Sequence, residues 1–322
     1  MKAITTMILS FALGIPFSSV AQDTWPTQKI TFLVPYPAGG PTDTMARLLS
    51  VPMAAKLGTP VVVDNRSGAS GNIGTGAVAR AKPDGYTILL ATSGNMSVNQ
   101  SLFKNLNYDP IKDFAPIIQI SRFPLVLEVK ADSPIKTMSD YLALARAERL
   151  KVTFGSAGNG TPMHLCPELI KKFAGVSLQH VPYKGTNPAM TDLLGGQITS
   201  ACDVIVGSIK YIQSGQVRAI AVTTKERVAV LPDVPTMDES GLKGFDYFAW
   251  HGIVAPAGTP TSILTRYNTI LNEIFKDSEF SKKWEAIGTP VVGGSASSFS
   301  ALIVSEAERL GALVKELGIQ AD

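Results

Sequence analysis

The stretch KITFLVPYPAGGPTDTMARLL (residues 29–49) contains an apolar, β-branched run, a glycine-rich turn and then a helix-like pattern. Gly39 and Gly40 allow backbone N–H groups to approach a ligand closely. A helix beginning at Pro41 or Thr42 would direct the positive end of its dipole to the same point, and Asp43 could cap its first turn. The stretch predicts a strand, a turn and a helix start that suits an anion. By itself it is also typical of an ordinary turn with a helix cap.

The same alternation of strand-like and helix-like segments continues along the chain. Continuous apolar strands between amphipathic helices are typical of parallel sheets covered on both faces. The expected strands after the first are residues 61–63, 86–92, 151–156, 178–183, 200–206 and 217–223, and the helix-like segments between them include 73–82, 163–175, 187–196 and 208–215.

Two extended apolar stretches bordered by Pro and Gly, residues 117–134 and 245–260, look like strands that cross between two lobes. Two crossings require the C-terminal segment to complete the first lobe. We therefore expect an α/β protein of two lobes, each a mainly parallel sheet flanked by helices. The first lobe is expected to comprise residues 22–123 and 246–322, and the second residues 124–245.

The first 21 residues have the pattern of a cleaved secretory signal. Lys2 precedes the apolar run ITTMILSFALGIPF, and the small residues SSVA end at Ala21. The run is too short, and too interrupted by Pro16, to span a membrane well. We expect an exported periplasmic protein, in which Cys166 and Cys202 could pair; the sequence leaves their distance, and so the bridge, open.

Composition and motifs argue against several classes of function. The formal net charge of +3 comes from Lys and Arg residues scattered among acids, which does not favour nucleic acid. The glycines at 39 and 40 lack the Gly-Lys-Ser/Thr of a phosphate loop, GNIGTG (71–76) is not a dinucleotide fingerprint, and Ser156 lacks the G-x-S-x-G elbow. His164 and Cys166 are spaced i, i+2. On a helix their side chains point in different directions, which does not favour a shared metal site. We therefore expect no enzyme, no metal and no cofactor.

A binding cleft remains, because ligands lie beyond the carboxyl ends of parallel strands. A second glycine-rich strand-to-helix turn, GSAGNGT (155–161), supplies Ser156, Gly158 and Thr161. Short polar groups also follow the strand that ends near residue 92, namely Thr92, Ser93 and Asn95. Asp203 interrupts the apolar segment SACDVIV, where it is either a buried acid satisfied by backbone N–H groups or a cleft residue.

At these residues the chain resembles the periplasmic solute-binding proteins of the tripartite tricarboxylate transporters, the Bug or TctC-like family. The resemblance covers nearly all of the chain after residue 21, in the segments WPTQKITFLVPYPAGGPTDTMARLL, VVVDNRSGASGNIGTGAVARAKPDGYTILLAT, VTFGSAGNGTPMHL, HVPYKGTNPAMTDLLGGQI, GQVRAIAVTTKERVAVLPDVPTMDESGL and GIVAPAGTP.

The resemblance implies two lobes that close like a venus flytrap on a carboxylate, without catalysis. It places Tyr36, Ala38, Gly39, Gly40 and Asp43 on one jaw and Ser156, Gly158 and Thr161 on the other. Thr92, Ser93 and Asp203 line the cleft between them, with Asn95 and His164 as further candidates. It also implies a monomer that delivers its ligand to inner-membrane permease subunits.

The far end of the pocket is expected to involve the crossing segments. Arg122 or His251 could meet a second carboxylate, and Phe123 or Trp250 could stack on an aromatic ring. These residues favour a di- or tricarboxylate, aliphatic or aromatic. The chain has Asp203-Val204 where the family commonly has Asp-Asn, so a side-chain amide is missing there. The alternatives are a secreted hydrolase that uses Ser156 and His164, and a receptor that signals to a sensor kinase.

Overall fold

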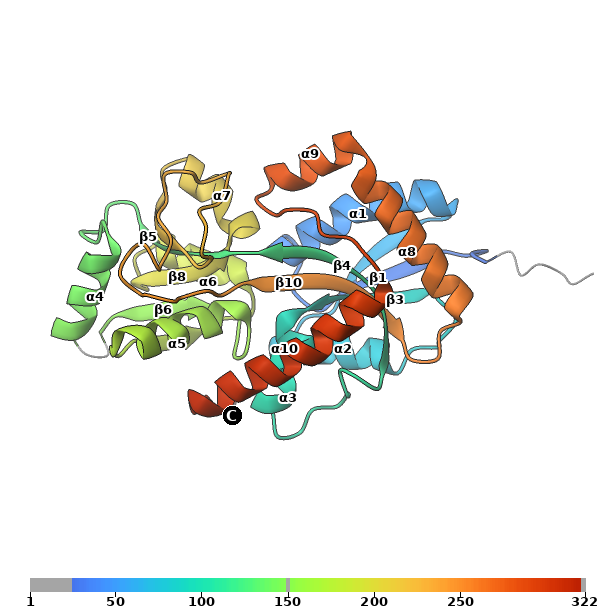
Figure 1. Ribbon diagram of the computed structural model, residues 1–322, viewed down its shortest axis with the longest axis horizontal. Helices are drawn as coiled ribbons and strands as arrows, with labels where there is room; N and C mark the ends of the chain where they lie inside the picture. The colour runs from blue at the N-terminus through green and yellow to red at the C-terminus, as the bar shows by residue number, and fades with distance from the viewer. Residues whose placement is uncertain (1–24, 149–150, 320–322) are drawn as a thin grey trace, which may run out of the picture.

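The computed structural model describes residues 25–148 and 151–319, and the predicted signal sequence lies outside them. Two five-stranded sheets form two lobes, with helices around each sheet (Figure 1). The first sheet has the order β2-β1-β3-β10-β4 and the second β7-β6-β8-β5-β9.

The first sheet consists of β1 (Ile30–Val34), β2 (Val61–Asn65), β3 (Thr87–Thr92), β4 (Phe114–Phe123) and β10 (Ala249–Pro256), and the second of β5 (Leu125–Lys130), β6 (Thr153–Ser156), β7 (Gln179–Pro182), β8 (Ser200–Val204) and β9 (Val217–Val222). The helices of the first lobe are α1 (Pro41–Leu57), α2 (Asn72–Ala79), α3 (Asn99–Leu102), α8 (Thr261–Lys276), α9 (Ser278–Ala286) and α10 (Ala296–Glu316), with short helical turns η1 (Ala69–Gly71) and η2 (Gly94–Val98). Those of the second lobe are α4 (Met138–Ala147), α5 (Pro162–Ala174), α6 (Thr186–Leu194) and α7 (Ile205–Gln213).

Each sheet is parallel except for one strand supplied by a crossing segment. In the first sheet β1 pairs in parallel with β2 and β3, whereas β10 pairs antiparallel with β3 and β4. In the second sheet β6 pairs in parallel with β7 and β8, whereas β5 pairs antiparallel with β8 and β9. Only Pro124 separates β4 from β5, and β10 returns to the first lobe beside β4. The predicted two-lobed α/β class is confirmed; the exact lobe boundaries stay a prediction.

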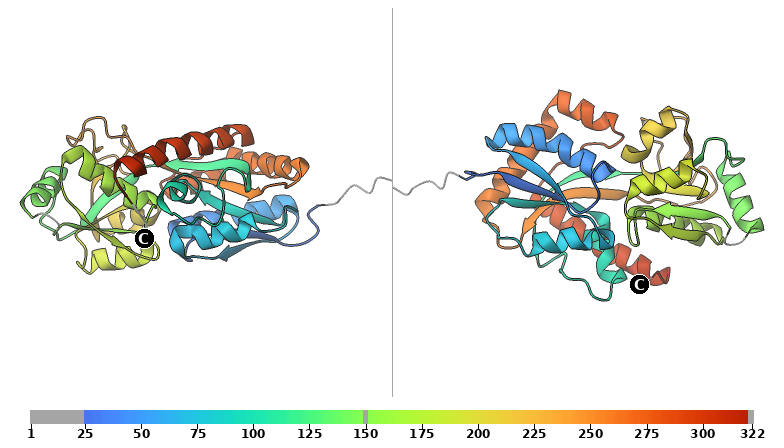
Figure 2. Two further views of the ribbon diagram at one scale, coloured as in Figure 1. Left: turned by 90° about the horizontal axis from the view of Figure 1, so that it is seen from below. Right: turned by 180° about the vertical axis from the view of Figure 1, so that it is seen from behind.

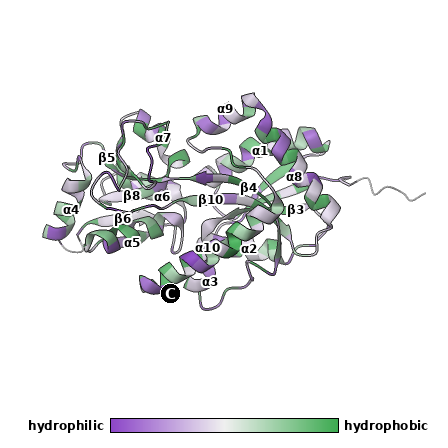
Figure 3. Cartoon of the chain, in the orientation of Figure 1, coloured by the Kyte–Doolittle hydropathy of each residue, from purple (hydrophilic) through white to green (hydrophobic). Residues whose placement is uncertain are grey.

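The strands of the first lobe bury both faces, as a sheet between two helix layers must. Ile30, Phe32 and Val34 of β1 pack in one apolar cluster with residues of α1 and α8. Leu33, between them in sequence, packs in another cluster with Phe299 of α10. This alternation follows from the two-residue period of a strand. Views from below and behind show the helices on both faces (Figure 2), and the strands are largely hydrophobic while the helices alternate along their length (Figure 3).

The C-terminal helix α10 joins the two lobes on the side of the crossing strands. It packs on β4 and η2, and its Leu310 and Val314 enter the apolar cluster of the second lobe. The Lys172 Nζ lies 2.5 Å from Glu316 Oε1, which ties α5 of the second lobe to the end of α10.

Two predicted element boundaries were wrong. The helix expected over residues 73–82 ends at Ala79, and Pro83 disfavours helical backbone at the predicted last residue, Lys82. The strand expected over 200–206 ends at Val204, and Ile205 begins α7. A short apolar run does not distinguish the end of a buried strand from the start of a buried helix.

Cys166 of α5 and Cys202 of β8 form a disulfide, the pairing that the sequence left open. It links the helix that follows the glycine-rich turn 156–161 to a neighbouring strand of the same lobe.

Candidate ligand-binding site

A cavity of about 40 Å³ lies between the two lobes. The first lobe lines it with Tyr36, Pro37, Gly40, Pro41, Thr42, Thr92, Phe123, Trp250 and His251, and the second lobe with Ala157, Thr161, Pro162, Met163, Gly185, Thr186, Asn187, Pro188 and Val204. The lining comes from strand ends and helix starts, which is where open α/β sheets bind ligands.

The N-terminal ends of four helices meet at this cavity. Pro41, Pro162 and Thr186 are the first residues of α1, α5 and α6, and Val204 directly precedes α7. Each helix start carries unpaired backbone N–H groups and the positive end of a dipole. The first lobe contributes one of these starts and the second lobe three, so closure of the lobes surrounds the cavity with positive potential.

The side chains on the cavity wall are uncharged. Among the described lining residues there is no Lys, Arg, Asp or Glu. Burial lowers the pKa of His251 to about 3, so its ring is neutral at pH 7. The His251 Nδ1 lies 3.2 Å from Ser121 Oγ, and the ring stacks on Phe123 with 4.6 Å between centroids. An anion here is met by neutral donors and helix ends.

The turn of the first lobe is fixed by Asp43. Its Oδ2 accepts hydrogen bonds from the Gly39 N–H at 2.8 Å and from Arg47 Nε at 2.8 Å. Burial alone raises the pKa of Asp43, but the hydrogen bonds from Arg47 and Gly39 outweigh it, and the pKa is lowered. The charged carboxylate thus holds the turn and is not turned toward the cavity.

The end of β3 forms a second polar group of the first lobe. Asn95 Oδ1 accepts from the Thr92 backbone N–H at 2.8 Å, and Asn95 Nδ2 donates to Thr75 Oγ1 at 2.7 Å. The Thr92 hydroxyl also lies 3.3 Å from the Tyr36 hydroxyl, on the cavity wall. Asn95 and Ser93 are buried behind that wall, and the Ser93 hydroxyl has no protein partner among the described residues.

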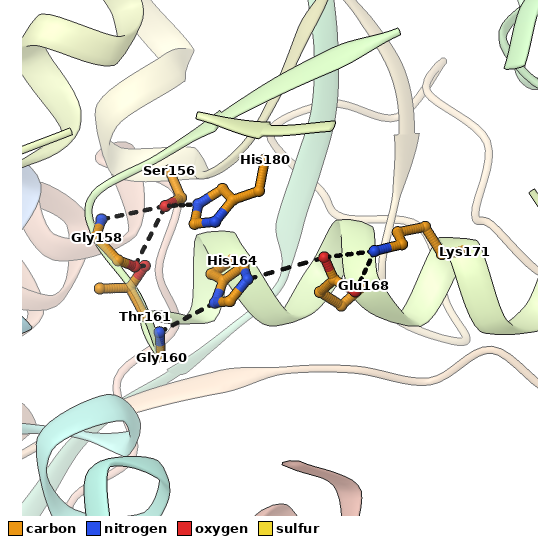
Figure 4. Close-up of polar contacts among 8 residues, drawn as sticks. All are labelled: Ser156, Gly158, Gly160, Thr161, His164, Glu168, Lys171 and His180. Carbon is orange, nitrogen blue, oxygen red and sulfur yellow. Dashed lines mark hydrogen bonds and ion pairs between the residues drawn. The ribbon is translucent and has the colours of Figure 1, made fainter. Parts of the chain in front are cut away.

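The turn of the second lobe is held by two histidines (Figure 4). Ser156 Oγ lies 2.7 Å from His180 Nε2 and accepts from the Gly158 N–H at 3.1 Å. At the other end of the turn, the Gly160 N–H donates to His164 Nδ1 at 3.1 Å. Thr161 Oγ1 donates to the Gly158 carbonyl at 2.7 Å. Both ends of the turn are therefore bonded to imidazole rings.

The two imidazole rings stack with their centroids 4.0 Å apart. Burial lowers the pKa of His164 to about 3, with smaller contributions from the charges of His180 and Lys171. Burial also lowers the pKa of His180 to about 4, with a smaller contribution from the charge of Lys171. Both rings are neutral at pH 7. The remaining His164 nitrogen, Nε2, faces Glu168 Oε1 at 3.8 Å, and Glu168 is paired with Lys171.

Glycines of the second lobe lie close against residues of the first lobe. A Cβ on Gly185, which has φ +121°, would lie 3.0 Å from Pro37 Cγ. A Cβ on Gly158, with φ +127°, would lie 3.0 Å from Ser70 Oγ. Both the conformation and the contact require glycine at these positions.

The structure brings together only part of the predicted set on the cavity wall: Tyr36, Gly40, Thr92, Thr161, Phe123, Trp250 and His251. Ala38, Gly39, Asp43, Ser93, Asn95, Ser156, Gly158, His164 and Asp203 lie outside that wall, and several of them support the turns. The sequence reasoning missed Gly185, Thr186 and Asn187. Their signal was VPYKGTNPAMTD (residues 181–192), which shares its initial VPY, a turn and its final TD with VPYPAGGPTD (residues 34–43).

Two predicted roles need correction. Arg122 is exposed and stacks on Phe248, with 3.6 Å between Cζ and the ring centroid, and does not line the cavity. Ser156 hydrogen-bonds His180 and not His164, because His180 lies on β7, which pairs with the strand of Ser156. The alternative hydrolase interpretation expected a Ser156–His164 pair, and the structure has a Ser156–His180 pair instead.

The described residues contain no cluster of three or more His, Cys, Asp or Glu side chains that could hold a metal. Within residues 25–148 and 151–319, none of the helices has the length and apolar character needed to cross a membrane.

Comparisons with known proteins agree with this geometry. The model of the tripartite tricarboxylate transporter family receptor (TctC) matches residues 45–319. The UPF0065 protein in the TAR-I ttuE-ttuC′ intergenic region of Agrobacterium vitis is 40% identical over 314 residues, which cover 97% of this chain and 90% of the relative.

Two solved structures are also similar to this chain. Rhodopseudomonas palustris Rpa4515 with adipate has a TM-score of 0.90 and 35% identity, covering 92% of this chain and 99% of that one. MatC of the same organism with bound malate has a TM-score of 0.86 and 32% identity, covering 90% and 100%. The chain belongs to the tripartite tricarboxylate transporter receptor family.

Proposed function

We propose that this protein is a periplasmic receptor that captures a small carboxylate between its lobes and delivers it to inner-membrane permease subunits. The observation that carries the proposal is the convergence of four helix N-termini on an uncharged cavity that both lobes line. Helix ends and neutral N–H and O–H donors bind a carboxylate without burying a cation, which would have its own desolvation cost.

The similar structures support the class of ligand. Rpa4515 was solved with adipate and MatC with malate, and both are dicarboxylates. The cavity of about 40 Å³ lies between the two lobes, so the ligand enters when the lobes separate and is enclosed when they close.

The role is binding and not catalysis. Ser156, the serine considered as a nucleophile, is 1% exposed, and its hydroxyl is engaged with His180 and the Gly158 N–H behind the cavity wall. The location, the signal sequence and the permease partner are further parts of the proposal, supported by the family to which the chain belongs.

Isothermal titration with adipate, malate and their uncharged diamides tests the proposal. We expect saturable binding of at least one dicarboxylate and no binding of the matching diamide. Equal binding of the diamide would overturn the carboxylate assignment.

A matched pair of variants locates the site. Thr161→Val removes the hydroxyl on the cavity wall that donates to the Gly158 carbonyl and holds the turn, and we expect an affinity loss of about fivefold, because a neutral hydrogen bond is worth roughly 1 kcal/mol. Thr261→Val makes the same change at the exposed start of α8 and is expected to bind like the wild type.

A further inference from the structure

Two acidic side chains are buried side by side in the sheet of the second lobe. Glu128 of β5 is 0% exposed and Asp203 of β8 is 2% exposed. The strands are antiparallel, with Val126 opposite Asp203 and Glu128 opposite Ala201. Glu128 and Asp203 therefore lie diagonally on the same face of the sheet, at a separation where side chains interact.

Only one oxygen of each carboxylate in this pair accepts a hydrogen bond from the described residues. Glu128 Oε1 accepts from Ser208 Oγ at 2.9 Å, and Asp203 Oδ1 accepts from the Val204 N–H at 2.7 Å. Glu128 Oε2 and Asp203 Oδ2 have no protein partner among the described residues. Two buried carboxylates that interact repel each other when both are ionised, and protonation of one of them relieves the repulsion.

The charged groups on the surrounding elements are engaged elsewhere. The face of α7 presents Gly207 and Ser208, and the neighbouring strand β9 presents Ala219 opposite Glu128. The ionisable groups of the packed elements have their own partners: Asp43 with Arg47 on α1, Glu168 with Lys171 and His164 with Gly160 on α5, Asp192 of α6 with Tyr183, Lys210 of α7 over the ring of Tyr211, and Arg218 of β9 with the Ser133 and Ile135 carbonyls.

Asp203 lies near the boundary between the two lobes. A Cβ on Gly207 would lie 2.7 Å from Asp203 Oδ2 and 3.0 Å from Cγ of Pro41, the first residue of α1 in the other lobe. Asp203 also borders a small void that shares Ala157, Met163 and Thr186 with the ligand cavity. Separation of the lobes therefore moves Pro41 away and admits water to the Asp203 carboxyl.

We infer that Glu128 and Asp203 form a proton-binding site, and that closure of the lobes on a carboxylate takes up a proton there. The inference rests on the proposed function, because it concerns the same closure. It adds a second ligand, the proton, to carboxylate capture.

The direction of the pH effect follows from burial. Burial raises the pKa of Asp203 to about 7, and burial together with the neighbouring Asp203 raises that of Glu128 well above its usual range. Hydration in the open form returns the pKa of Asp203 toward about 4. Because the pKa of Asp203 is higher in the closed form, protonation of Asp203 stabilises the closed form. This stabilisation is complete below the open-form pKa and is lost as pH rises through about 7.

Calorimetry of the full-length mature protein tests the inference with malate and adipate as probes. Titrations at pH 6.5, 7.5 and 8.5, in phosphate and in Tris, separate the heat of binding from the heat of buffer ionisation. The ordinary carboxyl groups of the probes stay ionised in this range. We expect uptake of a fraction of one proton per ligand near pH 7, and an affinity that falls about threefold between pH 6.5 and 7.5 and is nearly constant between pH 7.5 and 8.5.

Asp203→Asn assigns the proton to the pair. The amide keeps the shape of Asp203 but does not titrate, so we expect proton uptake to disappear and the affinity to become nearly independent of pH. Glu306→Gln is the matched control, because Glu306 is also buried, at 5% exposure, but is paired with Arg309. It is expected to retain the wild-type proton uptake.

A spectroscopic readout does not depend on the stability of the variant. Infrared difference spectra of ¹³C-labelled wild-type protein with unlabelled malate separate the carboxyl bands of the protein from those of the probe. We expect a protonated protein carboxyl to appear when malate binds at pH 7.5. Saturable binding without proton exchange would overturn this inference and leave the proposed function intact, and unchanged uptake in Asp203→Asn would overturn the assignment to the pair. Failure of every carboxylate to bind would overturn the proposed function and this inference with it.

Discussion

The hydroxyl of Ser156 and Nε2 of His180 lie 2.7 Å apart on neighbouring parallel strands, β6 and β7. The serine begins the glycine-rich turn of the second lobe, and the histidine lies behind it, partly shielded from solvent. The turn that presents Thr161 to the cavity is thus positioned by a ring that does not itself line the cavity.

His180→Phe keeps an aromatic ring against His164 and Phe154 but removes the hydrogen bond to Ser156. We expect carboxylate affinity to fall about fivefold, corresponding to roughly 1 kcal/mol for a lost side-chain hydrogen bond. Titration calorimetry measures the loss. In a double-mutant cycle with Ser156→Ala, the two losses should be strongly non-additive, since both variants break the same bond. Additive losses would show that the two residues act separately.

The stacked histidines predict acid sensitivity of folding. Their pKa values are lowered to about 3 for His164 and about 4 for His180, against about 6.5 in an unfolded chain. The folded protein therefore binds fewer protons than the unfolded chain. Their contribution to stability is complete above about pH 6.5 and is lost as pH falls toward 4.

Denaturant unfolding at pH 7 and pH 4.5 measures this effect. His164→Asn retains an oxygen that can accept from Gly160 but does not titrate, so we expect its stability to fall less over this interval than that of the wild type. An equal fall in both proteins would exclude His164 as the source.

Much of the fold could be predicted because it depends on local patterns. The apolar run at residues 29–34 and the glycines at 39–40 are sufficient for a strand, a turn and a helix start, and they occur as β1 and α1. The crossing of the chain between the lobes was visible as two apolar stretches bordered by Pro and Gly, which became β4, β5 and β10.

The side-chain partners depend on register and direction, which the sequence does not specify. His180 meets Ser156 across two strands whose pairing had to be known first. Arg122 and Phe123 are neighbours at the end of β4, and neighbours in a strand point to opposite faces. Phe123 lines the cavity, so Arg122 stacks on Phe248 instead. The pairing of Glu128 with Asp203 likewise requires the register of β5 against β8.

Gly185→Ala tests whether the close approach of the lobes matters for binding. The new Cβ would lie 3.0 Å from Pro37 Cγ, and alanine at φ +121° is strained. We expect the closed form to be destabilised by about 1–3 kcal/mol, and affinity to fall at least about fivefold. Gly196→Ala is the control, since Gly196 has φ +71° but nothing within 4 Å of its Cβ position. Equal affinity losses in the two variants would attribute the effect to backbone strain and not to closure.

The disulfide Cys166–Cys202 is expected to stabilise the second lobe. It closes a loop with a sequence separation of 36, for which the chain-entropy model gives roughly 3–4 kcal/mol. Denaturant unfolding of the Cys166→Ala, Cys202→Ala double variant should show a loss of this order. Unfolding of the wild type with and without a reducing agent is the parallel measurement. A difference below about 1 kcal/mol in both would contradict the expected contribution.

Arg122→Gln distinguishes the observed position of this residue from the role that the sequence suggested. The guanidinium of Arg122 is exposed over Phe248 and lies outside the cavity wall, so we expect the affinity for adipate and malate to stay within about twofold of the wild type. His251→Phe is the informative comparison, because His251 lines the cavity and its Nδ1 contacts Ser121. Phenylalanine preserves the stack on Phe123 but removes a polar group from the wall, so a loss of about tenfold is expected there. If Arg122→Gln instead weakened dicarboxylate binding tenfold while leaving the diamides unaffected, Arg122 would have to turn into the cleft when the ligand binds.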